Sequence, residues 1–465
     1  MVTELTEYEA AFVRLEPGQR VTVRRERRYD PEYGLLHMPG VRCATVVANG
    51  PTSCPDREWV REGLRRGVVG DEARSIPYRH PPSMPGAGRK RRIEIGAFPL
   101  DRYVETCEEE LVFGGLVDNL IGDASRPAAD RLQSILAERS LGNTANRRNV
   151  DPSILAGRME RSLAQQAPIQ FVLPAMPFKD QCAFRTEAPA DHVDLGEVAF
   201  LVRLHCLVLA ANQIHPYDAE CVVVSDGTAY APMFDIPTAA AVRYVETLRE
   251  IRDHLNLAKS IHIVHLKDLV DLDTEHSLTG SGKSIVEVRR TIRRHLGQLV
   301  KRDTACARSM SVLAYGMRWN LNTRALLDEA SPARLWKAMR RQGSRSTDDR
   351  ELVDLASRIS NRAMRAAIDY LSFNLAVNYC GLFDRYFPDA IRLTSHPKVG
   401  QVAAPRLGSV YPWNGVAVST EFDSDRVRAN SISSIELHSA LREGLVPVYR
   451  HGETYPICYT TPTKV

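Results

Sequence analysis

The sequence predicts an α/β protein with a Rossmann-like, mostly parallel sheet, a helical segment and an appended N-terminal region. Short apolar runs alternate with long amphipathic stretches between residues 169 and 266. This alternation requires crossover connections, which join parallel strands. Two of the apolar runs stop abruptly at polar clusters, as strands do at the ligand-binding edge of an open α/β sheet.

The N-terminal part of the chain differs in composition from the rest. It is rich in Pro, Gly and Arg and has only weak strand patterns, at 43–48 and 92–96. We therefore interpret 1–110 as an extension of irregular and short-strand character, 111–150 as a helical connector and 151–465 as the main α/β domain.

The elements expected at the start of the main domain follow one another in order. One helix begins at Pro152 with Asp151 as its N-cap. Another begins after Asp194, where Glu197 three residues later completes a capping box. A third follows Pro237. The expected strands are the apolar runs 169–173, 221–224 and 261–266.

Residues 285–385 are predicted to be mostly helical, and short strands and loops are expected from residue 391 onward. Apolar residues at helical spacing mark the inward face of the last long helix, namely Met364, Ile368, Leu371, Leu375 and Tyr379. The stretch GSGKS at 280–284 is not a phosphate-binding P-loop, because Ser277 stands where that motif needs its first glycine.

Composition argues against several classes of partner. The 61 Lys and Arg residues exceed the 57 Asp and Glu residues by only four, too few to indicate nucleic-acid binding. The N-terminus lacks a signal-peptide pattern, and no run of 18 apolar residues occurs. Nine scattered cysteines without a C-x-x-C pair are typical of free thiols in a reducing compartment. We expect a cytoplasmic protein with no nucleic-acid or membrane partner.

Two polar clusters follow predicted strands. Lys179 comes after prolines that hold the backbone extended and so fix its direction. It is either a phosphate-binding or carbonyl-activating amine or a surface lysine, and position alone does not separate these. The second cluster is Ser225–Asp226–Gly227. Taken alone it favours a hairpin turn, with a base or amine anchor at Asp226 as the alternative.

A third cluster lies at 392–397. If this stretch is extended, Arg392, Thr394 and His396 share one face. Arginine suits phosphate and histidine suits proton transfer near neutral pH, although a chance cluster in an arginine-rich chain is the alternative. Separately, His192 and Asp194 have the spacing of two ligands of an iron-binding triad, but Asp194 is already needed as a helix cap.

As a set, these segments resemble the isocyanide (isonitrile) synthase family of pyoverdine- and dityrosine-type biosynthetic proteins. The matching pieces occur in the family's order and are LPAMPFK (173–179), SDGTAY (225–230), FPDAIRLTSHP (387–397) and YPWNGV (411–416). The resemblance implies a carbon–carbon lyase of natural-product (secondary) metabolism with no metal or other cofactor. It would convert the amino group of an L-amino acid to an isocyanide, taking the carbon from C2 of ribulose 5-phosphate and releasing formaldehyde, hydroxyacetone and phosphate. A homodimer and a downstream oxygenase in the same pathway are compatible with it.

The resemblance also implies roles for individual residues. Lys179 and Arg392 would bind the sugar phosphate, with ketone activation as another role for Lys179. Asp226 would orient the amine or accept its proton, and His396 would move protons during the carbon–carbon cleavage. The other residues expected to contact substrate are Ser225, Ser395, Trp413 and Asn414.

Two departures from the family pattern leave other outcomes open. Asn414 stands where the family usually has histidine after Trp413, and Ser395 stands where it usually has isoleucine before His396. Asparagine does not titrate near pH 7. The chain would then N-formylate an amino acid, or condense it with a sugar phosphate without forming the isocyanide. A metal-dependent oxygenase using the His192 and Asp194 pair is the second alternative.

Overall fold

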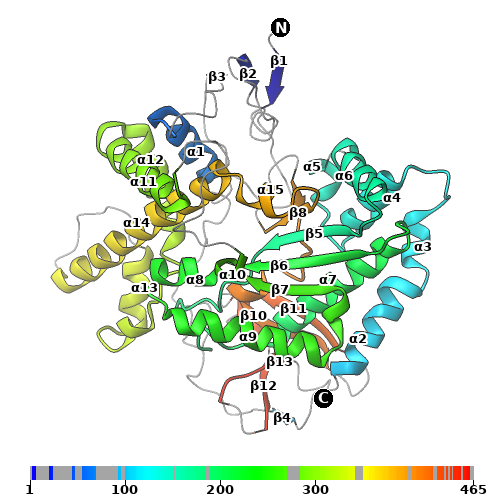
Figure 1. Cartoon of the computed structure of the whole chain (residues 1–465). Coiled ribbons are helices and arrows are strands. Elements are labelled where there is room, and N and C mark those ends of the chain that lie inside the picture. Colours follow the sequence, from blue (N-terminus) through cyan, green and yellow to red (C-terminus); the bar gives the residue numbers. More distant parts are fainter. Residues whose placement is uncertain are drawn as a thin grey trace.

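Figure 1 shows a computed structural model of the chain, built around a five-stranded sheet with strand order β7-β6-β5-β8-β9. The structure describes residues 3–6, 20–24, 44–47, 55–69, 93–95, 100–150, 152–184, 188–269, 283–340, 349–395, 401–422, 427–433, 436–437, 440–441, 444–451 and 454–460. Each strand pair of this sheet is parallel, which confirms the predicted fold class. The strands are β5 (Ile169–Pro174), β6 (Ala219–Ser225), β7 (Ile261–His265), β8 (Ile391–Thr394) and β9 (Val402–Ala403).

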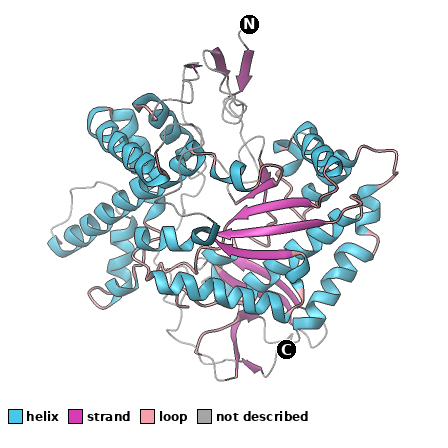
Figure 2. Cartoon of the chain, viewed as in Figure 1, coloured by secondary structure: helices cyan, strands magenta, loops and turns pink. Residues whose placement is uncertain are grey.

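Two helices cover one face of this sheet, as Figure 2 shows. α7 (Leu195–Asn212) connects β5 to β6, and α9 (Thr238–His254) connects β6 to β7. The predicted capping box of Asp194 and Glu197 at the start of α7 is confirmed. Among the described helices, α7 alone is long and apolar enough to cross a membrane, yet 83% of that stretch is buried inside the protein. α7 is therefore the central core helix of the fold.

The strand order changes direction at β5. From β5 the chain moves outward through β6 to β7, and it then returns to place β8 on the other side of β5. The carboxyl ends of β5 and β8 thus form the topological switch point, where open α/β sheets bind their ligands.

A group of helices is inserted between β7 and β8, and in Figure 1 the arrows of β5 and β6 point toward it. α1 from the N-terminal region packs against three of its members, α11, α12 and α14. The predicted helical character of 285–385 is confirmed, and the predicted inward face of α14 packs in the core of this group. The bounds are α1 (Arg57–Val69), α10 (Leu266–Leu269), α11 (Ile285–Arg302), α12 (Thr304–Met317), α13 (Pro332–Arg340), α14 (Arg350–Tyr379) and α15 (Leu382–Tyr386), with the 3₁₀ turn η6 (Arg324–Leu327). Another 3₁₀ turn, η5 (Leu257–Lys259), lies between α9 and β7.

Helices between the N-terminal region and β5 pack beside α7, in the hydrophobic core that α7 shares with the five-stranded sheet. α6 begins at Pro152, as predicted. The elements are α2 (Leu100–Glu108), the π-helix η3 (Glu109–Phe113), α3 (Leu116–Ile121), α4 (Ala128–Ala137), α5 (Asn146–Asn149) and α6 (Pro152–Ala164).

Two smaller sheets complete the fold. One has the order β11-β10-β13-β12-β4. It joins the N-terminal region to the C-terminal part of the chain, because β4 pairs in parallel with β12. The other has the order β1-β2-β3. β3 and β4 coincide with the weak strands expected at 43–48 and 92–96, while the proposed domain boundaries stay predictions. The strands are β1 (Thr3–Thr6), β2 (Arg20–Arg24), β3 (Ala44–Val47), β4 (Ile93–Ile95), β10 (Val416–Phe422), β11 (Val427–Ile432), β12 (Val446–Arg450) and β13 (Cys458–Thr460).

Candidate functional site

The loops that follow β5 and β6 are locked together at the switch point. Ser225 is fully buried, and its Oγ donates to the carbonyl of Met176 at 3.0 Å. A side chain on Gly227 would place its Cβ 1.9 Å from the carbonyl oxygen of Pro177, so only glycine permits this approach. The hairpin interpretation of 225–227 is wrong, because this segment ends a parallel strand and begins the short helix α8 (Gly227–Tyr230).

Asp226 is presented at this edge by the end of β6. It occupies the N-cap position of α8 and is half-buried. Burial raises the pKa of its carboxyl from 3.8 to about 7, although its own backbone, the Tyr230 hydroxyl and the charge of Arg392 lower it. Tyr230 lies one helical turn later, and its hydroxyl donates to Asn374 Oδ1 at 3.0 Å. Asp226 can therefore give or accept a proton near neutral pH.

Arg392 lies on the other side of β5 from Asp226. Its β8 position pairs with Val172 of β5. The guanidinium lies 4.6 Å above the ring of Phe383 and donates a long hydrogen bond of 3.4 Å to Asn378 Oδ1. Burial lowers its pKa, and it forms no ion pair within 4.0 Å with any side chain that the structure describes. Arg392 is thus available to an anionic ligand.

Helices of the insertion cover this edge. From α14, Tyr370 and Phe373 pack on the ring of Tyr230 at centroid distances of 5.3 and 5.4 Å. From α11, Arg289 lies 5.6 Å above Phe373. Sequence patterns did not identify these residues. Of these residues, only Tyr230 could have been identified from the sequence, because it follows Asp226 by four residues and so lies on the same helix face.

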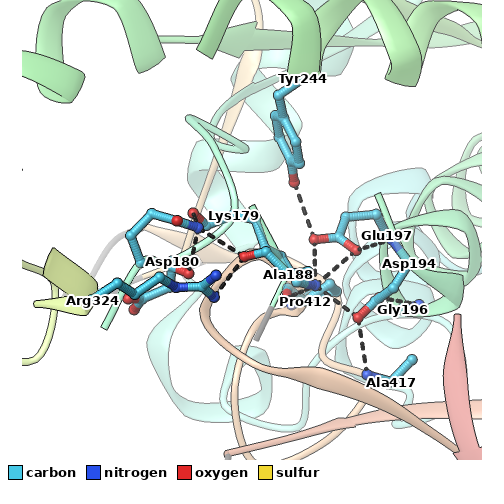
Figure 3. Close-up of polar contacts among 11 residues, drawn as sticks. Lys179, Asp180, Ala188, Asp194, Gly196, Glu197, Tyr244, Arg324, Pro412 and Ala417 are labelled. Carbon is cyan, nitrogen blue, oxygen red and sulfur yellow. Dashed lines mark hydrogen bonds and ion pairs between the residues drawn. The ribbon is translucent and has the colours of Figure 1, made fainter. Parts of the chain in front are cut away.

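Lys179 lies in a buried ion-pair cluster, drawn in Figure 3. Its Nζ, with the side chain 0% exposed, donates to Asp194 Oδ2 at 2.8 Å, to Glu197 Oε1 at 2.8 Å and to the carbonyl of Pro412 at 2.9 Å. The hydroxyl of Tyr244 also donates to Glu197 Oε1, at 3.2 Å. Burial and the neighbouring Asp194 carboxylate raise the pKa of Glu197 to about 8.

This cluster holds a turn from the far end of the chain in place. The ammonium of Lys179 has three protons, and its three partners use all of them. Through Pro412 it fixes the 3₁₀ turn η7 (Pro412–Asn414), and the Asp194 Oδ2 that accepts from Lys179 also accepts from Ala417 N at 3.2 Å. In this structure Lys179 has a positioning role, and direct contact with substrate stays a prediction.

The remaining predicted site residues lie around this turn and beyond β8. Trp413 is 5% exposed and stacks on Tyr411 at 4.9 Å, within the aromatic core. Asn414 ends the turn and is half-buried, as is Ser395 after β8. His396 lies outside the described residues. Their roles toward substrate stay predictions.

The positions considered for metal and nucleotide binding have other contacts. Asp194 caps α7 through Gly196 N at 2.8 Å and pairs with Lys179, so its carboxylate is already engaged. Within the described ranges, no three His, Cys, Asp or Glu side chains are grouped as a metal site requires. Ser284, the last residue of the GSGKS stretch, is the N-cap of α11 in a capping box with Glu287, while 280–282 lie outside the described residues.

Comparisons with known proteins agree with this architecture. The family model described as "Pyoverdine/dityrosine biosynthesis protein" matches residues 159–434, more than half of the chain. Isocyanide synthase A of Aspergillus fumigatus is 27% identical over 114 residues, which cover 24% of this chain and 18% of that relative. The crystal structure of PvcA from Pseudomonas aeruginosa superposes with a TM-score of 0.50 at 19% identity, covering 72% of this chain and 100% of that chain. At this identity, the similarity to PvcA concerns the fold alone.

Proposed function

The chain belongs to the pyoverdine/dityrosine biosynthesis protein family, and we propose that it is an isocyanide synthase-like lyase. The proposed substrates are an L-amino acid and ribulose 5-phosphate. Support comes from the family, from the fungal relative that is an isocyanide synthase, and from a half-buried acid and an unpaired arginine at the switch point of the sheet.

The proposed reaction balances without an external oxidant or reductant. The amine condenses with the C2 ketone and releases one water. C2 then becomes the isocyanide carbon, C1 leaves as formaldehyde, and C3 to C5 leave as hydroxyacetone and phosphate. Each step is a condensation, a bond cleavage or an elimination, so the catalyst must mainly move protons and hold the phosphate.

Asp226 carries this proposal. A carboxyl whose pKa is about 7 is suited both to take a proton from the attacking amine and to return one to a leaving oxygen. Tyr230 acts on this carboxyl and donates to Asn374 of α14, so it connects the end of β6 with the insertion.

Arg392 is the proposed phosphate ligand, because a guanidinium fork matches phosphate and no described carboxylate forms an ion pair with this one within 4.0 Å. We further propose that Lys179 acts by fixing the 412–414 turn, which brings Trp413 and Asn414 toward the substrates. His396 remains the proposed second proton carrier, and Ser395 a proposed substrate contact beside it. For Ser225 we propose that it shapes the site through Met176. A cytoplasmic location is part of the same proposal.

The experiment is a label-tracing assay with the full chain. Ribulose 5-phosphate carrying ¹³C at C2 is incubated with a panel of L-amino acids, and the products are followed by ¹³C NMR and mass spectrometry. We expect label at an isocyanide carbon, with formaldehyde, hydroxyacetone and phosphate in equal amounts. Label in a formamide would replace this proposal with the N-formylating alternative, which Asn414 favours because asparagine cannot shuttle protons at this pH.

A further inference from the structure

Arg289 and Arg392 both lie beside Tyr230 and hold their guanidinium groups over aromatic rings. Arg289 stacks on Phe373 at 5.6 Å and Arg392 on Phe383 at 4.6 Å. The Tyr230 hydroxyl acts electrostatically on both. Arg289 belongs to α11 and Arg392 to β8, and they lie over different rings, so they mark two separate positions.

Neither arginine has an anionic partner within 4.0 Å among the described side chains, which is unusual for partly buried cations. The contrast on α11 is clear, because Arg293, one turn after Arg289, pairs with Asp369 at 2.7 Å. Burial lowers the pKa of both Arg289 and Arg392. The charge of Asp369 at Arg289, and those of Asp384 and Asp226 at Arg392, offset this effect of burial in part. A partly buried cation without an ion pair is costly, so each position is suited to receive an anion from a ligand.

The surroundings of the two arginines differ. Arg289 adjoins the aromatic group formed by Tyr230, Tyr370 and Phe373, which suits an organic anion carrying an apolar side chain. Arg392 adjoins the amide of Asn378 and, through its charge, the carboxyl of Asp226. A polar setting of this kind suits a hydroxylated, phosphorylated sugar.

Resting on the proposed function, in which each substrate carries one anionic group remote from the reacting atoms, we propose that Arg289 binds the α-carboxylate of the amino acid while Arg392 binds the phosphate of the sugar. The amine and the ketone then meet beside Tyr230 and Asp226. Arg289 is in this way a substrate-binding residue supplied by the insertion, and it would make the enzyme select amino acids over simple amines.

The test measures binding without turnover, so it is independent of whether an isocyanide forms. Isothermal titration calorimetry compares three acid and amine pairs, L-tyrosine with tyramine, L-tryptophan with tryptamine and L-valine with isobutylamine, and also compares ribulose 5-phosphate with ribulose. For the wild type we expect at least one amino acid to bind about 10- to 100-fold more tightly than its amine. Arg289→Gln should remove that preference and leave the preference for the phosphorylated sugar, and Arg392→Gln should do the reverse.

Arg293→Gln is the matched control, because it removes the same charge one turn away where Asp369 already neutralises it, and it should keep both preferences. Thermal unfolding separates binding from folding. Loss of a partly buried cation that has no ion pair should leave the unfolding midpoint unchanged or raised for Arg289→Gln and Arg392→Gln, whereas a structural role would lower it. The proposal is overturned if no acid binds better than its amine, if Arg289→Gln keeps the preference, or if Arg289→Gln weakens phosphate recognition instead.

Discussion

Replacing Asp226 by asparagine should raise stability at alkaline pH while abolishing activity. The carboxyl has a pKa of about 7 in the folded chain, against 3.8 for an ordinary aspartate, chiefly because of burial. Below pH 4 the carboxyl is protonated in both the folded and the unfolded chain, so it does not lower the free energy of unfolding. Between pH 4 and pH 7 only the unfolded chain ionises, so stability falls as pH rises, and above pH 7 the loss is complete. At about 1.4 kcal/mol for each pKa unit, the shift from 3.8 to about 7 corresponds to a loss of a little over 4 kcal/mol for a fully buried carboxyl and about 2 kcal/mol for a half-buried one.

The assay is urea denaturation of wild type and Asp226→Asn from pH 5 to pH 9, with turnover measured alongside. The stability gain of the variant should grow from pH 5 to pH 7 and then stay constant. Turnover should fall by about 10²- to 10⁴-fold, the usual effect of losing a general acid–base group. Asp349→Asn is the control of opposite sign, because hydrogen bonds from Leu352 N and Arg334 lower the pKa of Asp349, so that variant should lose stability near neutral pH. A stability difference at Asp226 that is flat with pH, or turnover above a tenth of wild type, would refute the reasoning.

Three further changes test the rest of the site. Lys179→Ala should destabilise the chain by about 3–5 kcal/mol at pH 7, because it leaves the buried Asp194 carboxylate without its cation, beside a Glu197 carboxyl whose pKa of about 8 keeps it mostly protonated. Urea denaturation should show a smaller loss at pH 5, and an unchanged midpoint would contradict the closed cluster. Gly227→Ala should lower the unfolding temperature and abolish activity, because its Cβ would meet Pro177 O at 1.9 Å, whereas Gly297→Ala in α11, with nothing within 4 Å, should be neutral or stabilising by up to about 1 kcal/mol. Asn414→His should raise the rate at which label reaches the isocyanide carbon in the tracing assay, because histidine can carry protons near neutral pH, and an unchanged rate would remove Asn414 from the proton pathway.

Local sequence signals predicted the sheet and its caps well. The capping box of Asp194 and Glu197 spans four residues, so its hydrogen bonds depend only on neighbouring backbone. The strands at 169–174, 219–225 and 261–265 are short apolar runs between helices, a pattern that is compatible with few fold classes other than α/β. The position of a polar cluster after β5 and after β6 followed from these elements.

What each polar side chain does at that edge could not be predicted, because long-range contacts decide it. The direction of Lys179 depends on a carbonyl 233 residues away, at Pro412. Arg289 and Asn374 belong to the insertion, whose sequence has the pattern of ordinary amphipathic helices. The insertion lies near Asp226 because the chain after it returns to place β8 beside β5. The hairpin expected at 225–227 failed for the same reason, because Asp-Gly marks a chain reversal but does not distinguish a hairpin from a helix start.

Two carboxyls with raised pKa values lie near this edge, and their surroundings decide which one can catalyse. Glu197 is 0% exposed and accepts from Lys179, from Tyr244 and from the Asp194 backbone N–H, so no proton can reach a substrate from it without breaking the cluster. Asp226 is half-buried, its described partners are Tyr230 and the charge of Arg392, and it lies where the insertion meets the sheet. A general acid–base group must exchange protons with its substrate at each turnover. We therefore propose that the closed cluster supports the site structurally and that Asp226 takes part in the reaction.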